Sequence, residues 1–512
     1  YNKMKERFDK VEQLWNLRGI KQKEYNAECK TIIRDSNNLL KRMSAMKFFD
    51  PACGSGNFLI ITYKSLRWLE MDILKLQKQC QGEGGQMFVD NSVIRLDQFY
   101  GIELLDFPHE VAMLSLWLAE HQMNTKLNEE FGVNTKALPL KNITQIVCGN
   151  ACRLDWNVVC PHTKDEEVFV FGNPPYLGSK LQSIEQKNDI SAAFYGVNNC
   201  RILDYICCWF IYGTLYIKES NAKFAFVTTN SICQGEQVGV LWPALLNNNV
   251  EILFAHKSFK WSNNAKYNAG VTCVIIGVGN MDNKCPQKIF DNNHSIYVNY
   301  INPYLIPNIR TIVFRSNISP KGLPKLCFGC MPYDDKKRKH LRLDIFQKDE
   351  MIRKYPESEK FIRKIYGSEE YINGKELYCL WIDDDDIEMA ESIPPIKQRI
   401  EANRNFRLNE SADGQALAEK AHQFREHPDD MEKIIIPSVS SENRNYIPIG
   451  FLDNKTIVSN AAFALYDAPS WLFGILTSAM HMVWVKTVGG RLETRYRYSA
   501  QLCYNTFPFP KI

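Results

Sequence analysis

Short apolar runs alternate with stretches of helical periodicity through the first half of the chain, and this alternation is the strongest constraint on the fold. The apolar runs lie at 46–50, 98–103, 143–147, 168–171, 224–228, 250–255 and 272–276. Helical periodicity follows several of them, at 57–79, 106–122 and 204–217. Parallel strands need a crossover of a dozen or more residues, usually a helix. The pattern therefore predicts an α/β fold with a doubly wound, mostly parallel, seven-stranded sheet.

The 512 residues are too many for a single hydrophobic core. Residues 1–45 carry apolar side chains at helical spacing, which predicts a helical lead-in to the sheet domain, 46–285. The alternation then stops. Short strand-like runs, proline-rich turns and basic clusters predict a second, mixed α/β domain at 286–470 that continues into a C-terminal segment, 471–512.

Cysteine usage and hydropathy exclude some classes of protein. The 16 cysteines are scattered and no secretory segment is recognisable, which predicts reduced thiols in a cytoplasm. Two groupings lack the spacing of a structural zinc site, so we expect no metal; they are Cys327 with Cys330, and Cys148, Cys152 and Cys160 with His162. The longest apolar run, 471–485, falls short of the ~20 residues of a membrane span. The net charge of +4 neither demands nor excludes nucleic acid.

Two strand ends predict a site for a nucleoside cofactor. In open α/β sheets, ligands bind beyond the carboxyl ends of the strands. The first strand ends at Asp50, and Gly54 and Gly56 then let the backbone turn tightly towards a ligand. The glycine motifs of dinucleotide-binding proteins and of P-loop proteins are incomplete here. The negative charge of Asp50 instead favours an amine-bearing ligand such as S-adenosylmethionine. Glu103 ends the next strand and can accept from ribose hydroxyls, although such an acid is more often only a solvated strand end.

Two later strand ends add polar acceptors. Asp155 follows the third strand, where it either accepts from the amine of an adenine ring or caps a helix. The fourth strand leads into Asn173-Pro174-Pro175-Tyr176. The prolines remove two backbone donors and stiffen the turn, so the Asn173 oxygen and the Pro174 carbonyl can accept from one planar amine. Tyr176 offers a flat face for a base, which a plain proline-rich turn does not explain.

These motifs together resemble those of the amino-methylating DNA methyltransferases, and most closely the type IIL, MmeI-like restriction–modification proteins. In the first half the similar segments are 49–57, Glu103, Asp155, 173–180 and 254–263. In the second half they are 363–370, 437–444, 490–499 and 504–510. The resemblance implies a class I S-adenosylmethionine methyltransferase sheet followed by a target-recognition domain. It implies a bacterial, cytoplasmic enzyme that methylates N6 of a flipped-out adenine in double-stranded DNA.

The resemblance also assigns roles to residues. Catalysis falls to Asn173, Pro174, Pro175 and Tyr176, and packing of the target base to Tyr176, Phe259 and Trp261. Cofactor binding falls to Asp50, Pro51, Ala52, Cys53, Gly54, Ser55, Gly56, Asn57, Glu103, Leu104, Asp155 and Asn173. A further cofactor motif and a PD-ExK nuclease lie upstream in the family. No nuclease motif is recognisable here, so we expect a fragment that does not cut DNA; whether its parent carries the nuclease stays open.

Charged residues of the second half are candidates for DNA recognition. Arg491, Glu493, Arg495 and Arg497 alternate on a predicted strand. Arg is the usual bidentate partner of guanine and Glu accepts from cytosine N4, so we expect Glu493 and Arg495 to read one C·G pair. A surface ion pair is the alternative. The basic run 336–339 contacts either phosphates or only solvent.

Other functions stay open. The Asn-Pro-Pro-Tyr motif also occurs in methyltransferases of RNA adenine, of guanine N2 and of glutamine, but those are compact enzymes that leave 286–512 unexplained. Enzymes of cytosine N4 more often place Ser before Pro-Pro. An alternative from outside the enzymes is a DNA-recognition module that is inactive without the upstream cofactor motif.

Overall fold

The computed structural model describes residues 1–16, 20–82, 91–132, 145–260, 272–281 and 286–510. They form two compact units, one of residues 1–233 with 240–311 and the other of residues 234–239 with 312–512. The division falls later than the predicted boundary at 285, because strands beyond that boundary pair with the sheet of the first unit.

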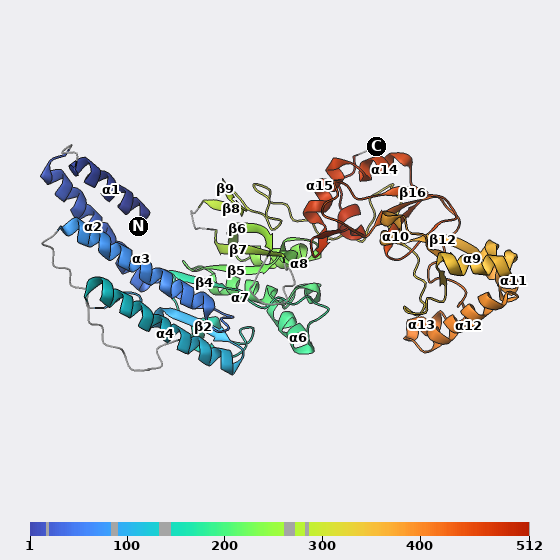
Figure 1. Ribbon diagram of the computed structural model, residues 1–512, viewed down its shortest axis with the longest axis horizontal. Helices are drawn as coiled ribbons and strands as arrows, with labels where there is room; N and C mark the ends of the chain where they lie inside the picture. Colours follow the sequence, from blue (N-terminus) through green and yellow to red (C-terminus); the bar gives the residue numbers. More distant parts are fainter. Residues whose placement is uncertain (17–19, 83–90, 133–144, 261–271, 282–285, 511–512) are drawn as a thin grey trace. The chain divides into compact units, whose positions relative to one another are not determined.

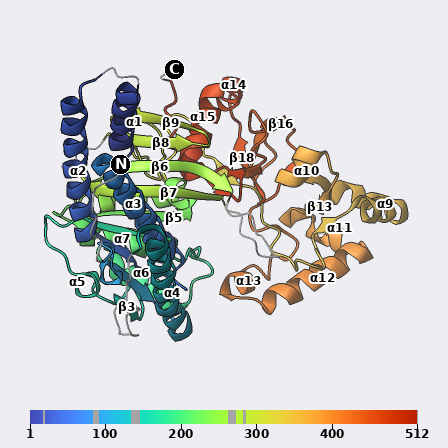
Figure 2. The ribbon, with the colours of Figure 1, turned by 60° about the vertical axis from the view of Figure 1, so that its left-hand side comes forward.

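Within the described residues, the first unit is built on one nine-stranded sheet of order β3-β2-β1-β4-β5-β7-β6-β8-β9 (Figure 1). The strands are β1 (Lys47–Asp50), β2 (Phe99–Glu103), β3 (Gln145–Cys148), β4 (Val168–Gly172), β5 (Lys223–Thr229), β6 (Val250–Lys260), β7 (Thr272–Asn280), β8 (Gln287–Asp291) and β9 (His294–Val298). Strands β1 to β5 are mutually parallel, whereas β7 runs antiparallel to both β5 and β6. Figure 2 shows β5, β7, β6, β8 and β9 one above another in this order. The mostly parallel α/β sheet is confirmed, but the described sheet has nine strands rather than seven.

Helices lie on both faces of this sheet, and α1 packs on α2 rather than on a strand. They are α1 (Asn2–Asn16), α2 (Gln22–Ala45), α3 (Asn57–Gln81), α4 (Asp106–Phe131), α5 (Trp156–Val159), α6 (Ile184–Ala193), α7 (Cys207–Ile217) and α8 (Glu236–Leu246). Successive side chains of a strand point to opposite faces. Phe48 of β1 stacks on Phe99 at 5.0 Å within a cluster that α3 and α4 complete. Phe49 lies against Trp156 of α5 and Tyr216 of α7, at 5.4 and 5.8 Å. Strand β1 is therefore buried on both sides, as expected for a central parallel strand.

A buried ion pair orders α3 and α4, which run side by side (Figure 1). Arg67 and Glu70 of α3 are 1% and 2% exposed, and Arg67 Nε lies 3.1 Å from Glu70 Oε2. Arg67 also donates to the Tyr63 hydroxyl and to Asn124 of α4. Glu70 accepts from the backbone amide of Val93. Because a buried charge is tolerated only when it is paired, this network fixes the two helices that begin beside the strand ends.

The second unit contains three smaller sheets in its described residues. The sheet β10-β18-β14-β16 and the sheet β15-β20-β19 are antiparallel, and β11-β13-β12-β17 has one parallel pair, β12 with β17. The strands are β10 (Cys327–Phe328), β11 (Arg342–Leu343), β12 (Ile362–Tyr366), β13 (Tyr378–Leu380), β14 (Lys433–Pro437), β15 (Val439–Ser440), β16 (Gly450–Leu452), β17 (Ile457–Val458), β18 (Ala462–Tyr466), β19 (Gly490–Leu492) and β20 (Arg495–Arg497). A separate, mixed second half is thereby confirmed.

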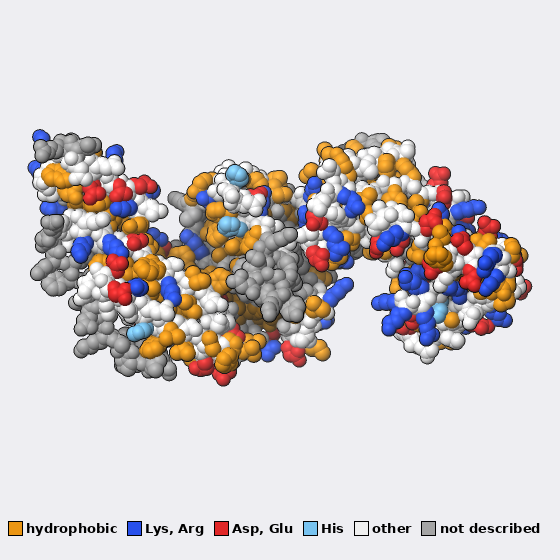
Figure 3. Space-filling model, in the orientation of Figure 1, with side chains coloured by type: hydrophobic (Ala, Val, Ile, Leu, Met, Phe, Trp, Pro, Cys, Tyr) orange, Lys and Arg blue, Asp and Glu red, His pale blue; other side chains and the backbone are white. Residues whose placement is uncertain are grey.

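Helices of the second unit surround these sheets. They are α9 (Ile345–Lys354), α10 (Ser368–Asn373), α11 (Ile387–Glu391), α12 (Pro394–Leu408), α13 (Ala412–Ala416), α14 (Ser470–Leu476) and α15 (Ala479–Val488). Lys and Arg side chains gather on the part of the surface near α12 and α13 (Figure 3). Across the described ranges, no single helix is long and apolar enough to span a membrane, and α14 and α15 pass that test only as a pair bent by 56°.

Replacing Arg67 by methionine should lower the free energy of unfolding by about 3–5 kcal/mol, because Glu70 then stays buried without its counter-charge. Arg42→Met is the matched control: Arg42 pairs with Glu167 at an exposed position, and such pairs contribute about 0–1 kcal/mol. Urea unfolding followed by intrinsic fluorescence measures both variants. Equal destabilisation by the two substitutions would contradict the role given to Arg67.

Candidate functional site

The candidate site lies at the carboxyl ends of β1, β2, β3 and β4. Strand β1 pairs with β2 on one side and with β4 on the other, and the chain order of the strands reverses at this point. A crevice forms outside such a reversal, and ligands of open α/β sheets bind there. The structure thus brings the ends of these four strands, and the residues that follow them, to one edge of the sheet.

A tight turn connects β1 to α3. Gly54 and Gly56 adopt left-handed backbone conformations, with φ of +55° and +82°. A Cβ on Gly56 would lie 3.2 Å from the Cβ of Ala112 in α4, so the turn also depends on close packing. The Gly54 amide donates to Glu103 Oε2 at 2.9 Å, and the Trp209 indole donates to the Pro51 carbonyl at 3.0 Å. The turn is therefore held from two sides, with the N-terminus of α3 directed to the strand ends.

Asp50 is a buried carboxylate with one oxygen unused. Its Oδ1 accepts from the Ala52 amide at 3.0 Å, whereas Oδ2 is buried and has no hydrogen-bond partner among the described residues. Burial, with a contribution from nearby Glu103, raises the pKa of Asp50 to about 7. A Cβ on Gly172 would lie 2.4 Å from Asp50 Oδ1, so glycine is required at the end of β4. Among the described residues, nothing supplies the donor that Asp50 Oδ2 lacks.

Glu103, at the end of β2, already accepts two backbone hydrogen bonds. Its Oε2 accepts from Gly54 and its Oε1 from Leu105, at 2.9 and 3.0 Å. A carboxylate has about four lone-pair sites, so two remain for a ligand, and the side chain is only partly buried. Leu104 beside it is exposed. Glu103 therefore links the glycine turn to the neighbouring strand and keeps acceptor capacity.

Asp155 caps a helix, which is one of the two roles predicted for it. Its side chain is exposed and accepts from the Asn157 amide at 2.9 Å at the start of α5. Asn150 lies closer to the end of β3, and the sequence interpretation missed it. Its Oδ1 accepts from the Cys152 amide at 2.8 Å, while its Nδ2 lies 3.3 Å from the buried Asp189. Its position three residues beyond the predicted strand 143–147 was the available signal.

The turn that follows β4 presents an unpaired acceptor. Asn173 Oδ1 is buried and has no hydrogen-bond partner within the described residues. Pro174 is buried and Pro175 exposed. Beyond the motif, the Leu177 amide donates to Asp204 at 2.7 Å, and its carbonyl accepts from Gln182 at 2.8 Å. These bonds fix the backbone at Leu177, four residues after Asn173. The Asn173 oxygen keeps its acceptor capacity, since no described residue donates to it.

Aromatic residues lie beside this turn. The Tyr176 hydroxyl interacts with the Cys273 thiol of β7, and burial followed by this thiol raises the pKa of Tyr176. Phe259 of β6 lies directly opposite Cys273 in the antiparallel ladder. Opposed residues project on the same face of a sheet, so Phe259 is on the side of Cys273 and Tyr176. Trp261, the other residue expected here, lies outside the described residues.

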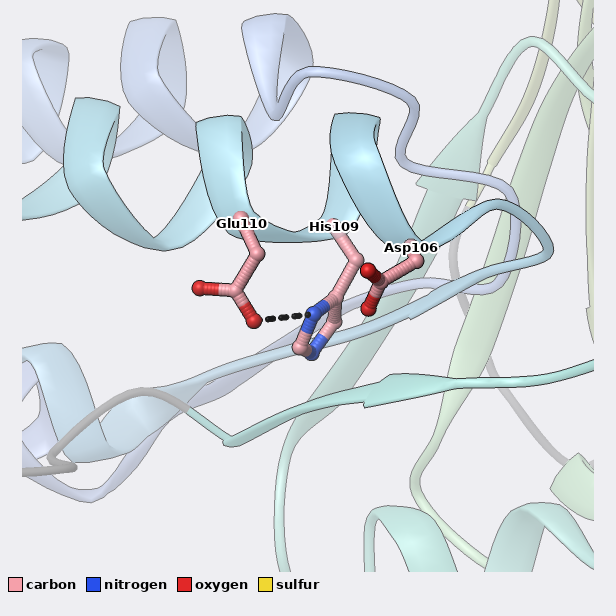
Figure 4. A group of neighbouring side chains, drawn as sticks. All are labelled: Asp106, His109 and Glu110. Atoms are coloured by element: carbon pink, nitrogen blue, oxygen red, sulfur yellow. Dashed lines mark ion pairs between the residues drawn. The ribbon is translucent and has the colours of Figure 1, made fainter.

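One group of side chains in the described part of the chain has metal-ligand spacing, and it differs from the two cysteine groupings. Asp106, His109 and Glu110, at the start of α4, bring ligand atoms within 4.8 Å of one another (Figure 4). His109 Nε2 lies 3.1 Å from the Ile146 carbonyl and Nδ1 lies 3.2 Å from Glu110. Both acids are exposed, and acids at a helix N-terminus are favourable without any ion. The group supplies no argument for a metal.

The four charged recognition candidates lie on a hairpin, not on one strand as predicted. Strands β19 and β20 pair with Leu492 opposite Arg495, so Glu493 and Thr494 form a two-residue turn. Glu493 has φ of +59° and pairs with Arg495 at 3.1 Å. Arg491 lies 4.5 Å from the centre of the Tyr496 ring on the other face. Glu493, Arg495 and Arg497 are exposed, which leaves these three at the tip and outer face of the hairpin.

Comparison with known proteins identifies two family domains in the chain. The MmeI DNA-methyltransferase domain matches residues 22–291, and the MmeI target recognition domain matches residues 307–511. DNA methyltransferase A of Bacillus subtilis is 48% identical over 478 residues, which are 93% of this chain and 54% of that protein. The chain therefore spans about half the length of this relative.

A solved structure is similar over nearly the whole chain. It is the type IIL restriction-modification enzyme MmeI in complex with DNA, with a TM-score of 0.83 and 37% sequence identity. The similarity covers 98% of this chain and 68% of that one. The family resemblance of the sequence motifs is confirmed: the chain belongs to the MmeI family of DNA methyltransferases, with the DNA-methyltransferase domain followed by the target recognition domain.

Proposed function

We propose that this chain is the modification part of a restriction–modification protein and methylates N6 of adenine at a specific site in duplex DNA. The observation that carries the proposal is the buried Asn173 Oδ1, which has no partner among the described residues at the end of β4. A planar exocyclic amine supplies the donor that this oxygen lacks. Membership of the MmeI family and the similarity to the B. subtilis methyltransferase support it.

A methyltransferase domain implies S-adenosylmethionine as cofactor, and the residues present fit it. Asp50 Oδ2, which has no partner in the described part of the chain, suits an ammonium group, which the amino acid end of the cofactor carries. The turn through Gly54 and Gly56 lets the backbone approach it closely. Glu103 has lone pairs left for ribose hydroxyls. Asn150 and Asp155 follow the third strand, where the adenine ring would lie. The first seven strands correspond to a class I methyltransferase sheet, to which β8 and β9 add.

When bound, the cofactor supplies an already activated methyl group, so the chain's residues mainly align and stabilise. The target base is inaccessible inside a duplex and must be flipped out. Asn173 Oδ1 and the Pro174 carbonyl accept from its amine, which directs the nitrogen lone pair and stabilises the positive charge that develops on it. Tyr176 and Phe259 offer aromatic faces to the base. Trp261 remains a proposed base-packing residue by family resemblance alone.

The hairpin tip of the second unit is the proposed reader of sequence. Its exposed Glu493 and Arg495 carry groups that match the edges of cytosine and guanine. The 3.1 Å ion pair between them satisfies both charges in the free protein, and exposed pairs of this kind contribute about 0–1 kcal/mol. The pair therefore opens at small cost when each partner meets a base.

Asn173→Ala should reduce methyl transfer by at least about 100–1000-fold, because a preorganised acceptor for the developing charge is lost. Binding of S-adenosylmethionine should change only a few-fold. Asn247→Ala, at an exposed turn, is the matched control and should leave both quantities unchanged. Tritium transfer to duplex DNA, with nucleoside analysis of the product, measures the effect. Retained activity in Asn173→Ala, or methylcytosine as the product, rejects the assignment.

Binding of S-adenosylmethionine should depend on pH through Asp50. Its pKa is raised to about 7 in the free protein, and a bound ammonium group favours the ionised carboxylate. Below that pKa, binding must therefore release a proton, and affinity should fall by up to about tenfold for each pH unit of acidification. Above about pH 8 it should level off. Titration calorimetry in two buffers measures the proton release, and Asp50→Asn should bind weakly without it. A flat profile in the unsubstituted chain contradicts this role.

Exchanging Glu493 and Arg495 for each other should change the methylated sequence at one base pair, because the donor and acceptor patterns are reversed. The matched control exchanges Glu350 and Lys354, an exposed ion pair on α9, and should leave the sequence unaltered. Methylation-sensitive sequencing of DNA from expressing cells reads the outcome. An unchanged methylation motif in the Glu493/Arg495 exchange excludes this pair as a base reader.

A further inference from the structure

A turn of four consecutive cations lies in the second unit and takes no part in the site described above. Lys336, Lys337, Arg338 and Lys339 are all exposed. None of the four forms an ion pair within the described ranges, because the neighbouring Asp334 pairs with Arg342 at 2.8 Å. Basic side chains gather on this part of the second unit, near α12 and α13 (Figure 3). The four side chains are therefore directed to solvent, and the Asp335 carboxylate inside the turn offsets only part of their charge.

The backbone of the turn is organised from within. Asp335 Oδ1 accepts from the amides of Lys337 and Arg338 at 2.8 and 2.7 Å. These bonds lower the pKa of Asp335, so the carboxylate stays ionised and serves as a fixed internal cap. Lys339 donates its amide to the Asp335 carbonyl at 2.8 Å. The four side chains thus radiate from a closed loop.

Helix α12 holds the same loop with two arginines. Arg399 Nη1 lies 3.0 to 3.4 Å from the carbonyls of Lys339, His340 and Arg342. Arg407, which is fully buried, donates to the carbonyls of Pro332 and Tyr333 just before the loop, at 2.9 and 3.1 Å. Both guanidinium groups bond backbone carbonyls of the loop or of the residues beside it, so they hold its backbone in place.

The loop is also strained. Tyr333 and Lys339 have φ of +46° and +51°, a region that costs non-glycine residues about 1–3 kcal/mol each and persists only where surroundings enforce it. Strain, internal capping and two arginine anchors together favour a loop whose cations are held in fixed positions.

We propose that residues 336–339 form a phosphate clamp that holds the target recognition domain on the DNA backbone without reading bases. The inference rests on the proposed function, because the ligand is duplex DNA. Phosphate contacts fix the register and orientation of a protein on a duplex and carry no sequence information directly. The clamp therefore sets where the hairpin at Glu493 and Arg495 can meet a base pair, and Arg399 is its positioning residue.

The test is the salt dependence of DNA binding by the variant K336Q/K337Q/R338Q/K339Q. Each lost phosphate contact should reduce the slope of log affinity against log salt by about 0.9, so a change of about 2–4 is expected. At low salt the affinity should fall by about 10–1000-fold, equally for duplexes with and without the methylation motif. The methylated sequence should not change. Fluorescence anisotropy over a range of NaCl concentrations gives both quantities.

Two further variants separate position from charge. K3Q/K10Q/K23Q/K30Q removes four exposed cations from α1 and α2, giving the same net charge, and should keep the original slope. K336R/K337R/R338K/K339R keeps the charges of the loop and should also keep it. Any of three results overturns the clamp. They are an unchanged slope in K336Q/K337Q/R338Q/K339Q, an equal change of slope in K3Q/K10Q/K23Q/K30Q, and a loss of affinity confined to the duplex that carries the methylation motif.

Failure of the proposed function gives a different result. One result is that the loop variants change DNA binding as predicted, while the unsubstituted chain binds the cofactor but transfers no methyl group. The clamp then stands and the proposed activity is wrong. If the unsubstituted chain does not bind duplex DNA at any salt concentration, both are wrong. Circular dichroism and binding of S-adenosylmethionine, which the loop variants should retain, exclude misfolding as the cause of lost affinity.

Discussion

The buried carboxylate of Asp50 beside Gly172 is the contact on which the arrangement of the site depends. Any side chain at position 172 would overlap Asp50 Oδ1, and Gly172 immediately precedes Asn173. The same contact therefore sets where the Asn-Pro-Pro-Tyr turn leaves the sheet. Strands β1 and β4 pair directly, and adjacent strands lie about 4.7–4.9 Å apart. The oxygens of Asp50 and Asn173 that have no partner among the described residues therefore belong to neighbouring strand ends. An unsatisfied buried acceptor costs about 1–3 kcal/mol. Bound donors at these two positions would recover that energy, which makes the fold selective for ligands that supply them.

Residues 204–209, at and just before the start of α7, couple the two turns of the site. Trp209 donates to the Pro51 carbonyl in the glycine turn, and Asp204 accepts from the Leu177 amide behind the Asn-Pro-Pro-Tyr turn. Neutral bonds of this kind contribute about 0.5–1.5 kcal/mol and bonds to charged groups about 1.5–3. Residues 204–209 therefore set the distance between the proposed cofactor side and the proposed base side. A change in the packing of α7 would disturb alignment without removing any residue that touches a ligand, and alignment is a large part of methyl transfer.

The sequence predicts the parts of this fold that repeat a pattern. Strands followed by long helices were recognisable, as was the acceptor turn after β4. Strands β8 and β9 were not, because they form a short hairpin without a crossover helix and join the sheet through β6. The hairpin at Glu493 was read as one strand because Glu-Thr is not a usual hairpin turn, which favours Asn-Gly or Gly-X. The oxygens that lack a partner among the described residues, and the anchors Arg399 (half-buried) and Arg407 (buried), depend on contacts between distant segments. Periodicity carries no information on these contacts.

The hairpin at Glu493 and the basic loop 336–339 each hold a charged residue in a left-handed backbone conformation, which non-glycine residues disfavour. Glu493 at the hairpin tip and Lys339 in the basic loop have positive φ, and each is fixed by bonds from neighbours. Arg491 donates to the Thr494 carbonyl at the tip, as Arg399 does to the Lys339 carbonyl in the loop. Glycine would relieve the strain at either position but would remove the charged side chain. A charged residue at a strained position therefore sacrifices stability for a fixed placement of its charge.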